Sequence, residues 1–280
     1  MKHRAKPLPS LCLLALCLLT VGLLAVPPLP ALAAAGELAC KPGADCREPV
    51  TGLDFAWVPG GCFRMGCDTR GGVEHACEPD ERPLREVCVH GFWLAKTELT
   101  QGQLARLRGQ AVPPVPEVDL PATDLSWQDA KRLMEPLRGL TGPNLRPRLP
   151  TEAEWEYACT AGGRVGPYSF GLPADNQGWE VLNAGGQAHA VAQRSPNPFG
   201  LFDMSGNVWE WCEDSFHFTA YSYLGKDDPR QSRDTGRRVR RGGSFRYCTT
   251  CMRCSNRKSA PPEDRMDDMG LRFALEPVPR

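Results

Sequence analysis

Three cysteines near the C-terminal end of the chain have a spacing that suits chemistry. Cys248, Cys251 and Cys254 are each separated by two residues in the stretch RRGGSFRYCTTCMRCSNR, residues 240–257. A CxxC pair can close as a redox-active disulfide whose thiols have a lowered pKa. The three thiolates could instead bind zinc, with His217 as the fourth ligand. The third interpretation is that they form ordinary disulfides, within the cluster or with other cysteines.

The N-terminus indicates an oxidising compartment for these cysteines. Positive residues at positions 2–6 precede an almost wholly apolar run at 11–26, and small residues follow at 31–36. This order is typical of a secretory signal peptide, which we assign to residues 1–35. The apolar run is shorter than the ~20 residues of a membrane-spanning helix, and two prolines follow it. We therefore expect export to the periplasm or the extracellular space, with no membrane span after cleavage.

The number of cysteines fits such a compartment. The chain has 13, and removal of Cys12 and Cys17 with the signal peptide leaves 11, so at least one stays unpaired. Residues 36–54, with Cys40 and Cys46, are either a small disulfide-closed unit or a simple tether. Elsewhere the expected pairs are Cys62 with Cys88 and Cys67 with Cys77, while Cys159 and Cys212 are available to the cluster.

Composition and local signals favour a mixed α+β fold. The 28 glycines and 27 prolines suit short elements joined by many loops. Residues 55–67 and 85–100 have the pattern of strands. The formal net charge of zero argues against nucleic acid as a partner. Three helices are predicted by capping boxes, at Thr100 with Gln103, Ser126 with Asp129, and Thr151 with Glu154.

Several motifs together resemble one known family. FAWVPGGCFRMG, FWLAKTELTQGQ, RLPTEAEWEYAC, NPFGLFDMSGNVWEWCED, RRGGSF and MGLRFAL occur in the order found in the formylglycine-generating enzyme, or sulfatase-modifying factor, family. The resemblance implies a single domain over residues 55–277 with a variant of the C-type lectin fold, rich in loops, with few helices and short antiparallel strands. We expect a monomer that acts on a protein or peptide, which for this family would be a sulfatase. The family also includes proteins with other activities, so the fold extends further than one function.

In the catalytic branch of that family, two cysteine thiolates hold Cu(I), a soft ion that prefers sulfur ligands. The pattern there is GGS, an aromatic residue, one further residue, a cysteine, four residues and a second cysteine. Here Cys248 comes one position later, and Cys251 follows after only two residues. The resemblance implies copper at Cys248 and Cys251, with Ser244 and Trp209 shaping the pocket, in a loop shorter than the family's. Cys254 falls where some members have a structural half-cystine.

The segment DMSGNVWE corresponds to a structural calcium site in the same family. Carried over position by position, the ligands are the Asp203 side chain, the carbonyl groups of Gly206 and Val208, and the Glu210 carboxylate. Oxygen ligands on a tight, glycine-containing turn suit a hard cation. The alternative is that Asp203 caps a turn and Glu210 forms an ion pair on the surface.

Two functions from different classes fit these observations. The first is an exported, O₂-dependent oxidase that modifies a cysteine or another side chain of a partner protein or peptide. The second is a non-catalytic module that binds a protein or a glycan on the same lectin-like fold. The state of the clustered cysteines separates them, because only the oxidase needs an accessible reduced pair. The histidines lack metal-ligand spacing, which argues against the iron-dependent branch, and we expect the tryptophans of the motifs in the core.

Overall fold

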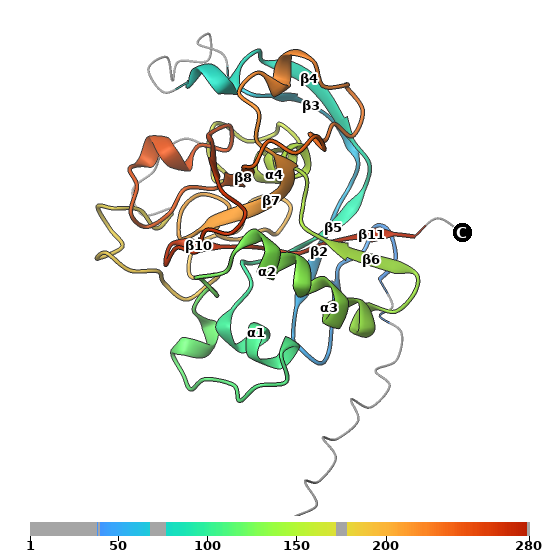
Figure 1. Cartoon of the computed structure of the whole chain (residues 1–280), viewed down its shortest axis with the longest axis vertical. Helices are drawn as coiled ribbons and strands as arrows, with labels where there is room; N and C mark the ends of the chain where they lie inside the picture. The colour runs from blue at the N-terminus through green and yellow to red at the C-terminus, as the bar shows by residue number, and fades with distance from the viewer. Residues whose placement is uncertain (1–37, 39, 68–76, 172–177, 279–280) are drawn as a thin grey trace, which may run out of the picture. The chain divides into compact units, whose positions relative to one another are not determined.

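A computed structural model describes residues 38, 40–67, 77–171 and 178–278 of the 280-residue chain (Figure 1). The signal peptide predicted for residues 1–35 lies outside the described residues. The described helices are all too short or too polar to span a bilayer. Short strands, few helices and long loops make up the described fold, which confirms the mixed α+β class.

A bent antiparallel ribbon makes up the N-terminal part of this fold. Strand β3 pairs with β4, and β2 pairs with β5. The ribbon bends between these two halves, where Gly60 and Gly91 approach each other (Figure 1). A Cβ atom on Gly60 would lie 2.8 Å from the Gly91 nitrogen, so the bend leaves no room for a side chain there. The bounds are β2 Asp54–Val58, β3 Gly61–Met65, β4 Arg85–Val89 and β5 Phe92–Ala95.

The described fold has two larger sheets, and strands β2 and β5 of the ribbon belong to the first of them. The first has the order β1-β2-β5-β11-β6 and is antiparallel throughout, and the second has the order β10-β7-β8-β9. Strand β10 runs parallel to β7, which corrects the expectation of antiparallel strands alone. The parallel pair forms because β10 reaches β7 through a long connection and not through a hairpin. The remaining bounds are β1 Cys46–Arg47, β6 Leu145–Arg148, β7 Trp209–Ser215, β8 Arg238–Arg241, β9 Arg257–Ala260, β10 Met269–Gly270 and β11 Ala274–Pro277.

The helices of the described part begin where the capping signals predict. All three predicted capping boxes are present, at the starts of α1, α2 and α4, each with both reciprocal hydrogen bonds. Helix α3 follows α2 directly and has no capping side chain, which is why the sequence did not indicate it. The α-helices are α1 Gln101–Leu107, α2 Trp127–Arg132, α3 Met134–Thr141 and α4 Glu152–Cys159, and the short 3₁₀ helices are Pro79–Glu81, Glu117–Asp119, Ala220–Ser222 and Thr249–Met252.

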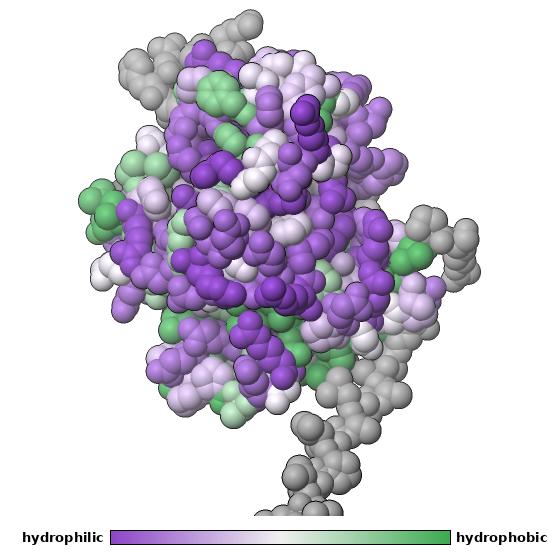
Figure 2. Space-filling view, viewed as in Figure 1, coloured by the Kyte–Doolittle hydropathy of each residue, from purple (hydrophilic) through white to green (hydrophobic). Residues whose placement is uncertain are grey.

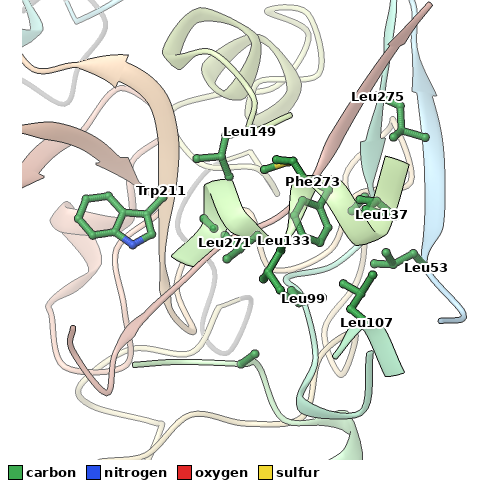
Figure 3. Packing of buried hydrophobic residues seen from close by; sticks show 14 of the residues in the cluster. Leu53, Leu99, Leu107, Leu133, Leu137, Leu149, Trp211, Leu271, Phe273 and Leu275 are labelled. Carbon is green, nitrogen blue, oxygen red and sulfur yellow. The ribbon is translucent and has the colours of Figure 1, made fainter. Parts of the chain in front are cut away.

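Apolar side chains from the helices and the five-stranded sheet form a large core. Figure 3 shows Leu133 and Leu137, from the α2–α3 region, close to Phe273 before β11. The placement of tryptophans in the core is confirmed for four of them, which are at most 1% exposed: Trp93, Trp155, Trp209 and Trp211.

The described residues of the N-terminal segment, 38 and 40–54, pack against the same core. Strand β1 is the edge strand of the five-stranded sheet, and Leu38 and Leu53 belong to the apolar cluster. A disulfide joins Cys40 to Cys46. These contacts favour the disulfide-closed unit over a simple tether.

Buried ion pairs join segments that are far apart in the sequence. The Arg257 guanidinium donates two hydrogen bonds of 2.7 Å to the Glu152 carboxylate, which connects β9 to α4. Removal of one partner from such a pair leaves the other charge buried without a counter-charge. Four pairs of this kind, with side chains at most 3% exposed, are Glu81–Arg253, Glu152–Arg257, Glu156–Arg241 and Glu210–Arg272.

We expect Glu152→Ala to lower the free energy of unfolding by about 3–5 kcal/mol, because Arg257 would stay buried without its partner. Chemical denaturation with the disulfides intact measures this loss. The control is Asp54→Ala, which breaks the Arg47–Asp54 pair, whose side chains are 65% and 42% exposed. The control should change the free energy of unfolding by less than about 1 kcal/mol, and equal losses in both variants would contradict the role given to burial.

Candidate functional site

The clustered cysteines lie in a loop, residues 244–254, that is fixed at both ends. At its start, the Ser244 hydroxyl donates a hydrogen bond of 2.7 Å to Asp268. At its end, Cys254 forms a disulfide with Cys159, the last residue of α4. We call this segment the thiol loop.

Cys248 and Cys251 face each other within the thiol loop. Their sulfur atoms are 3.8 Å apart, and the Cys251 amide donates a hydrogen bond of 2.9 Å to the Cys248 carbonyl. Both are free thiols, of which Cys248 is exposed and Cys251 is partly buried. The Thr250 hydroxyl lies 3.2 Å from the Cys248 sulfur. The loop thus presents one accessible thiol with a second thiol in contact with it.

The two thiols differ in acidity. The hydrogen bond with Thr250 lowers the pKa of Cys248 below its usual value, because it stabilises the thiolate. Burial raises the pKa of Cys251, because desolvation disfavours the charged form, and the neighbouring Cys248 sulfur adds to this effect. The thiolate is the form of cysteine that attacks electrophiles and binds metals, so Cys248 is the more reactive of the two.

The third cysteine of the cluster is structural. Because Cys254 is bonded to Cys159, it cannot supply a thiolate, which excludes a zinc site made from all three cysteines and His217. Cys212 is a free thiol that is completely buried. Cys62–Cys88 and Cys67–Cys77 are disulfides, as the sequence predicts, and Cys40–Cys46 closes the N-terminal segment for which the sequence left two alternatives open.

Ser244 and Trp209 support the thiol loop from inside the protein. Both side chains are completely buried. The Trp209 ring meets the Tyr247 ring edge-on, with ring centroids 5.6 Å apart, so that β7 packs against the residue before Cys248. Because neither side chain reaches the surface, they position the loop from the interior. Their role in shaping a pocket stays a prediction.

A pocket of about 440 Å³ lies beside the thiol loop, and Gly162, Pro167 and Arg253 form part of its wall. Arg253 belongs to the thiol loop, and its Nε donates a hydrogen bond of 2.9 Å to the Thr250 carbonyl. This volume is within the range of about 300–1,000 Å³ that is usual for ligand pockets. The pocket is therefore large enough for a short segment of a partner chain, although neither Cys248 nor Cys251 lines it.

Tyr168 lies near the thiols and Glu180 lies near Tyr168, and no sequence motif predicted either position. Burial raises the pKa of the Tyr168 phenol, and the negative charges of Cys248, Glu180 and Cys251 add to this effect. Glu180 is 8% exposed, and its Oε2 atom has no hydrogen-bond partner within the described part of the chain. No local pattern marks these two residues, because they lie in irregular segments that only the fold brings to the thiol loop.

Two of the residues expected to bind calcium, Asp203 and Glu210, lie near the buried Arg272. The Glu210 carboxylate accepts hydrogen bonds of 2.7 and 2.6 Å from Arg272 and one of 2.7 Å from Trp155. Asp203 has a left-handed φ of 56°, and its carboxylate accepts a hydrogen bond of 2.7 Å from the Ala192 amide. Asp203 thus caps a turn, as the alternative to calcium predicts, but the ion pair of Glu210 is buried and not on the surface.

Glu98 adds a third carboxylate to this cluster, which the sequence analysis also missed. It is completely buried and accepts a hydrogen bond of 3.1 Å from the Val208 amide. Burial raises the pKa of Glu98, and the charges of Asp203 and Glu210 add to this effect. Glu98, Asp203 and Glu210 thus bring three carboxylates near Arg272, which with Trp155 already occupies both oxygens of Glu210.

Comparison with known proteins gives a family match, similar sequences and a similar solved structure. The profile of the family described as "Sulfatase-modifying factor enzyme 1-like domain" matches residues 41–277. The serine/threonine-protein kinase pkn1 of Chlamydia pneumoniae is 28% identical over 255 residues, which are 81% of this chain and 38% of that protein. The formylglycine-generating enzyme of Streptomyces coelicolor is 33% identical over 172 residues, 55% of this chain and 52% of that protein. The structure of PvdO from Pseudomonas aeruginosa aligns with a TM-score of 0.73 and 27% identity, over 85% of this chain and all of that one. The chain thus spans about half or less of the two sequence relatives.

We expect iodoacetamide to modify Cys248 first, Cys251 more slowly, and Cys212 only after denaturation, because exposure and thiolate content decrease in this order. Mass mapping after mild reduction measures the three rates. Thr250→Val should slow the reaction of Cys248 several-fold at neutral pH, whereas Thr249→Val is the matched control without a contact to that sulfur. Modification of Cys212 in the native protein at the rate of Cys248 would contradict the described burial.

Proposed function

This chain belongs to the sulfatase-modifying factor enzyme 1-like family, and we propose that it is an exported oxidase that uses O₂ to oxidise a cysteine or another side chain of a partner protein or peptide. The observation that carries this proposal is the pair of free thiols, 3.8 Å apart, one of them exposed. An oxidase of this kind needs an accessible reduced pair, and a binding module does not. The relatives named formylglycine-generating enzyme support a protein cysteine, such as that of a sulfatase, as the substrate.

We propose Cu(I) as the cofactor, bound by Cys248 and Cys251. Two free sulfur donors that face each other fit a soft ion. The lowered pKa of Cys248 favours the thiolate, which is the form that binds metal. Bound Cu(I) would supply the electron transfer to O₂ that protein side chains alone do not provide.

The surrounding residues hold the thiols in place and admit the partner. The Cys159–Cys254 disulfide and the Ser244–Asp268 hydrogen bond fix the ends of the thiol loop. We place the reacting segment of the partner in the pocket of about 440 Å³ next to the loop. Tyr168 is 2% exposed and adds an aromatic ring near the thiols, which limits the access of water from that side.

A calcium ion at the Asp203 turn is the second cofactor in this proposal. Asp203, the carbonyls of Gly206 and Val208, and Glu210 would bind it. The acidic character of the cluster and the positive φ values of Asp203 and Gly206, 56° and 104°, which make the turn tight, support this site. Because Glu210 already pairs with Arg272, the ion would share that carboxylate, and its role is to stabilise the fold.

The same proposal includes the fold family and the cellular compartment of the protein. We infer that the fold is a variant of the C-type lectin fold, which its short strands, few helices and long loops support. Export to the periplasm or the extracellular space is supported by four disulfides among the described cysteines, because disulfides persist in oxidising compartments.

Anaerobic titration of the reduced protein with Cu(I) tests the oxidase. We expect one tightly bound ion per chain, and no tight binding in the variant that combines Cys248→Ser with Cys251→Ser. Cys212→Ser is the matched control, since it removes a free thiol that is buried, and should bind as the wild type does. The loaded protein should then oxidise a cysteine-containing peptide when O₂ is admitted.

Equal Cu(I) binding by the wild type and the double variant would show that Cys248 and Cys251 do not form the copper site. If the wild type binds no Cu(I) and oxidises no peptide, the oxidase proposal fails, and a module that binds a protein or a glycan is the alternative on this fold.

Calcium should raise the melting temperature of the wild type by several degrees relative to a sample with chelator, because an ion that binds only the folded state stabilises it. Asp203→Ala should abolish this calcium-dependent shift, and Glu263→Gln, at an exposed acidic residue, should retain it. A shift of the same size in Asp203→Ala would show that calcium does not bind at this turn.

A further inference from the structure

We propose that Cys248 and Cys251 also form a thiol–disulfide exchange site that acts on disulfides of partner polypeptides without a metal. This activity differs from oxidation by O₂ and does not depend on it. Three features carry the inference: the contact between the two sulfur atoms, their unequal exposure, and the exposed apolar side chains beside them.

The contact between the thiols favours closure to a disulfide. The sulfur atoms, now 3.8 Å apart, are already in contact and must approach to about 2.0 Å to form a bond. The hydrogen bond from the Cys251 amide to the Cys248 carbonyl already holds the backbone in one tight turn. Since the ends of the thiol loop are fixed elsewhere, the pair can open and close without disturbing the fold.

Unequal exposure gives the two thiols different roles. Cys248 is exposed and can attack a disulfide of the partner. Cys251 is partly buried and in contact with the Cys248 sulfur, so it can release a partner bound there. Cys254 is already oxidised and Cys212 is completely buried, so neither of them competes in the reaction.

The reaction proceeds in two balanced steps. The Cys248 thiolate bonds to one sulfur of the partner disulfide, the partner's S–S bond breaks, and the other partner sulfur leaves as a thiolate that takes a proton from water. Cys251 then gives its proton to water and bonds to the Cys248 sulfur, which releases the first partner sulfur as a thiolate. Two electrons pass from the protein dithiol to the partner disulfide, and the reverse sequence oxidises a partner dithiol.

The surface beside Cys248 favours a polypeptide over a small disulfide. The Val181 amide donates a hydrogen bond of 3.1 Å to the Tyr247 carbonyl, which holds residues 178–184 against the thiol loop. There Leu182 is 86% exposed and Val181 is 48% exposed. Figure 2 shows apolar surface, in green, at the left edge of the molecule, over the yellow loop of Figure 1 that precedes β7. We infer that the substrate is a disulfide flanked by apolar residues in an extended segment of a partner chain.

The test uses the reduced protein without copper, with a chelator and without O₂, so that no metal-dependent oxidation contributes. The probes are glutathione disulfide and a peptide whose disulfide is flanked by leucines. In Cys251→Ser we expect a stable mixed disulfide between Cys248 and the probe, detected by mass spectrometry. In the wild type we expect an internal Cys248–Cys251 disulfide and free probe thiols. Cys248→Ser should react at least about 10-fold more slowly, and Cys212→Ser should behave as the wild type does.

Leu182→Asp tests the choice of substrate. It should slow exchange with the leucine-flanked peptide several-fold and leave exchange with glutathione disulfide unchanged. Val115→Asp is the matched control, because Val115 is 80% exposed but lies in the loop after α1. Equal slowing with both probes in Leu182→Asp would overturn the polypeptide preference.

Equal yields of mixed disulfide in Cys248→Ser and Cys251→Ser, or a wild type that forms no internal disulfide, would overturn the exchange site. These results would leave the oxidase proposal unaffected, because Cu(I) titration measures metal binding by the reduced pair. The two proposals therefore fail separately.

Discussion

The site depends on buried arginine–glutamate pairs. The thiol loop has little regular backbone pairing, because the strands around it are short. Hydrogen bonds from charged side chains hold this part of the chain instead. Arg241 pairs with Glu156 and donates hydrogen bonds of 3.0 and 2.7 Å to the carbonyls of Cys254 and Asn256. An arginine that binds a carboxylate and the backbone together fixes an irregular segment, because its planar guanidinium sets the directions of all these bonds. The thiols keep their geometry because the chain after them is held in this way.

The third cysteine decides what the first two can do. Cys254 is bonded to Cys159, which anchors the thiol loop to α4 and takes one sulfur out of the cluster. Two thiols remain, and they share neither the same exposure nor the same acidity. A pair of this kind can bind a soft metal or exchange disulfides, since both reactions need an accessible thiolate with a second sulfur beside it. With only two residues between them, Cys248 and Cys251 lie close enough for their sulfur atoms to be in contact.

Local patterns in the sequence were sufficient for much of the fold. The capping boxes at Thr100, Ser126 and Thr151 depend on side chains three positions apart, so the helix starts could be predicted without the tertiary structure. Strand alternation placed the ribbon, and the pairing of Cys62 with Cys88 followed from its neighbouring strands. The order of the motifs indicated the family, because such motifs are short and contiguous.

The site itself was decided by the tertiary structure. The sequence identified the thiol pair by its spacing, but the partner of Cys254, the burial of Ser244 and the approach of Tyr168 to the thiols all depend on long-range contacts. The same is true of the acidic cluster, to which Glu98 comes from a segment more than 100 residues before Val208. A sequence pattern reports which groups are near each other along the chain. Which distant charges meet in the interior is determined by packing, since each buried group must find a partner or bear the full cost of desolvation.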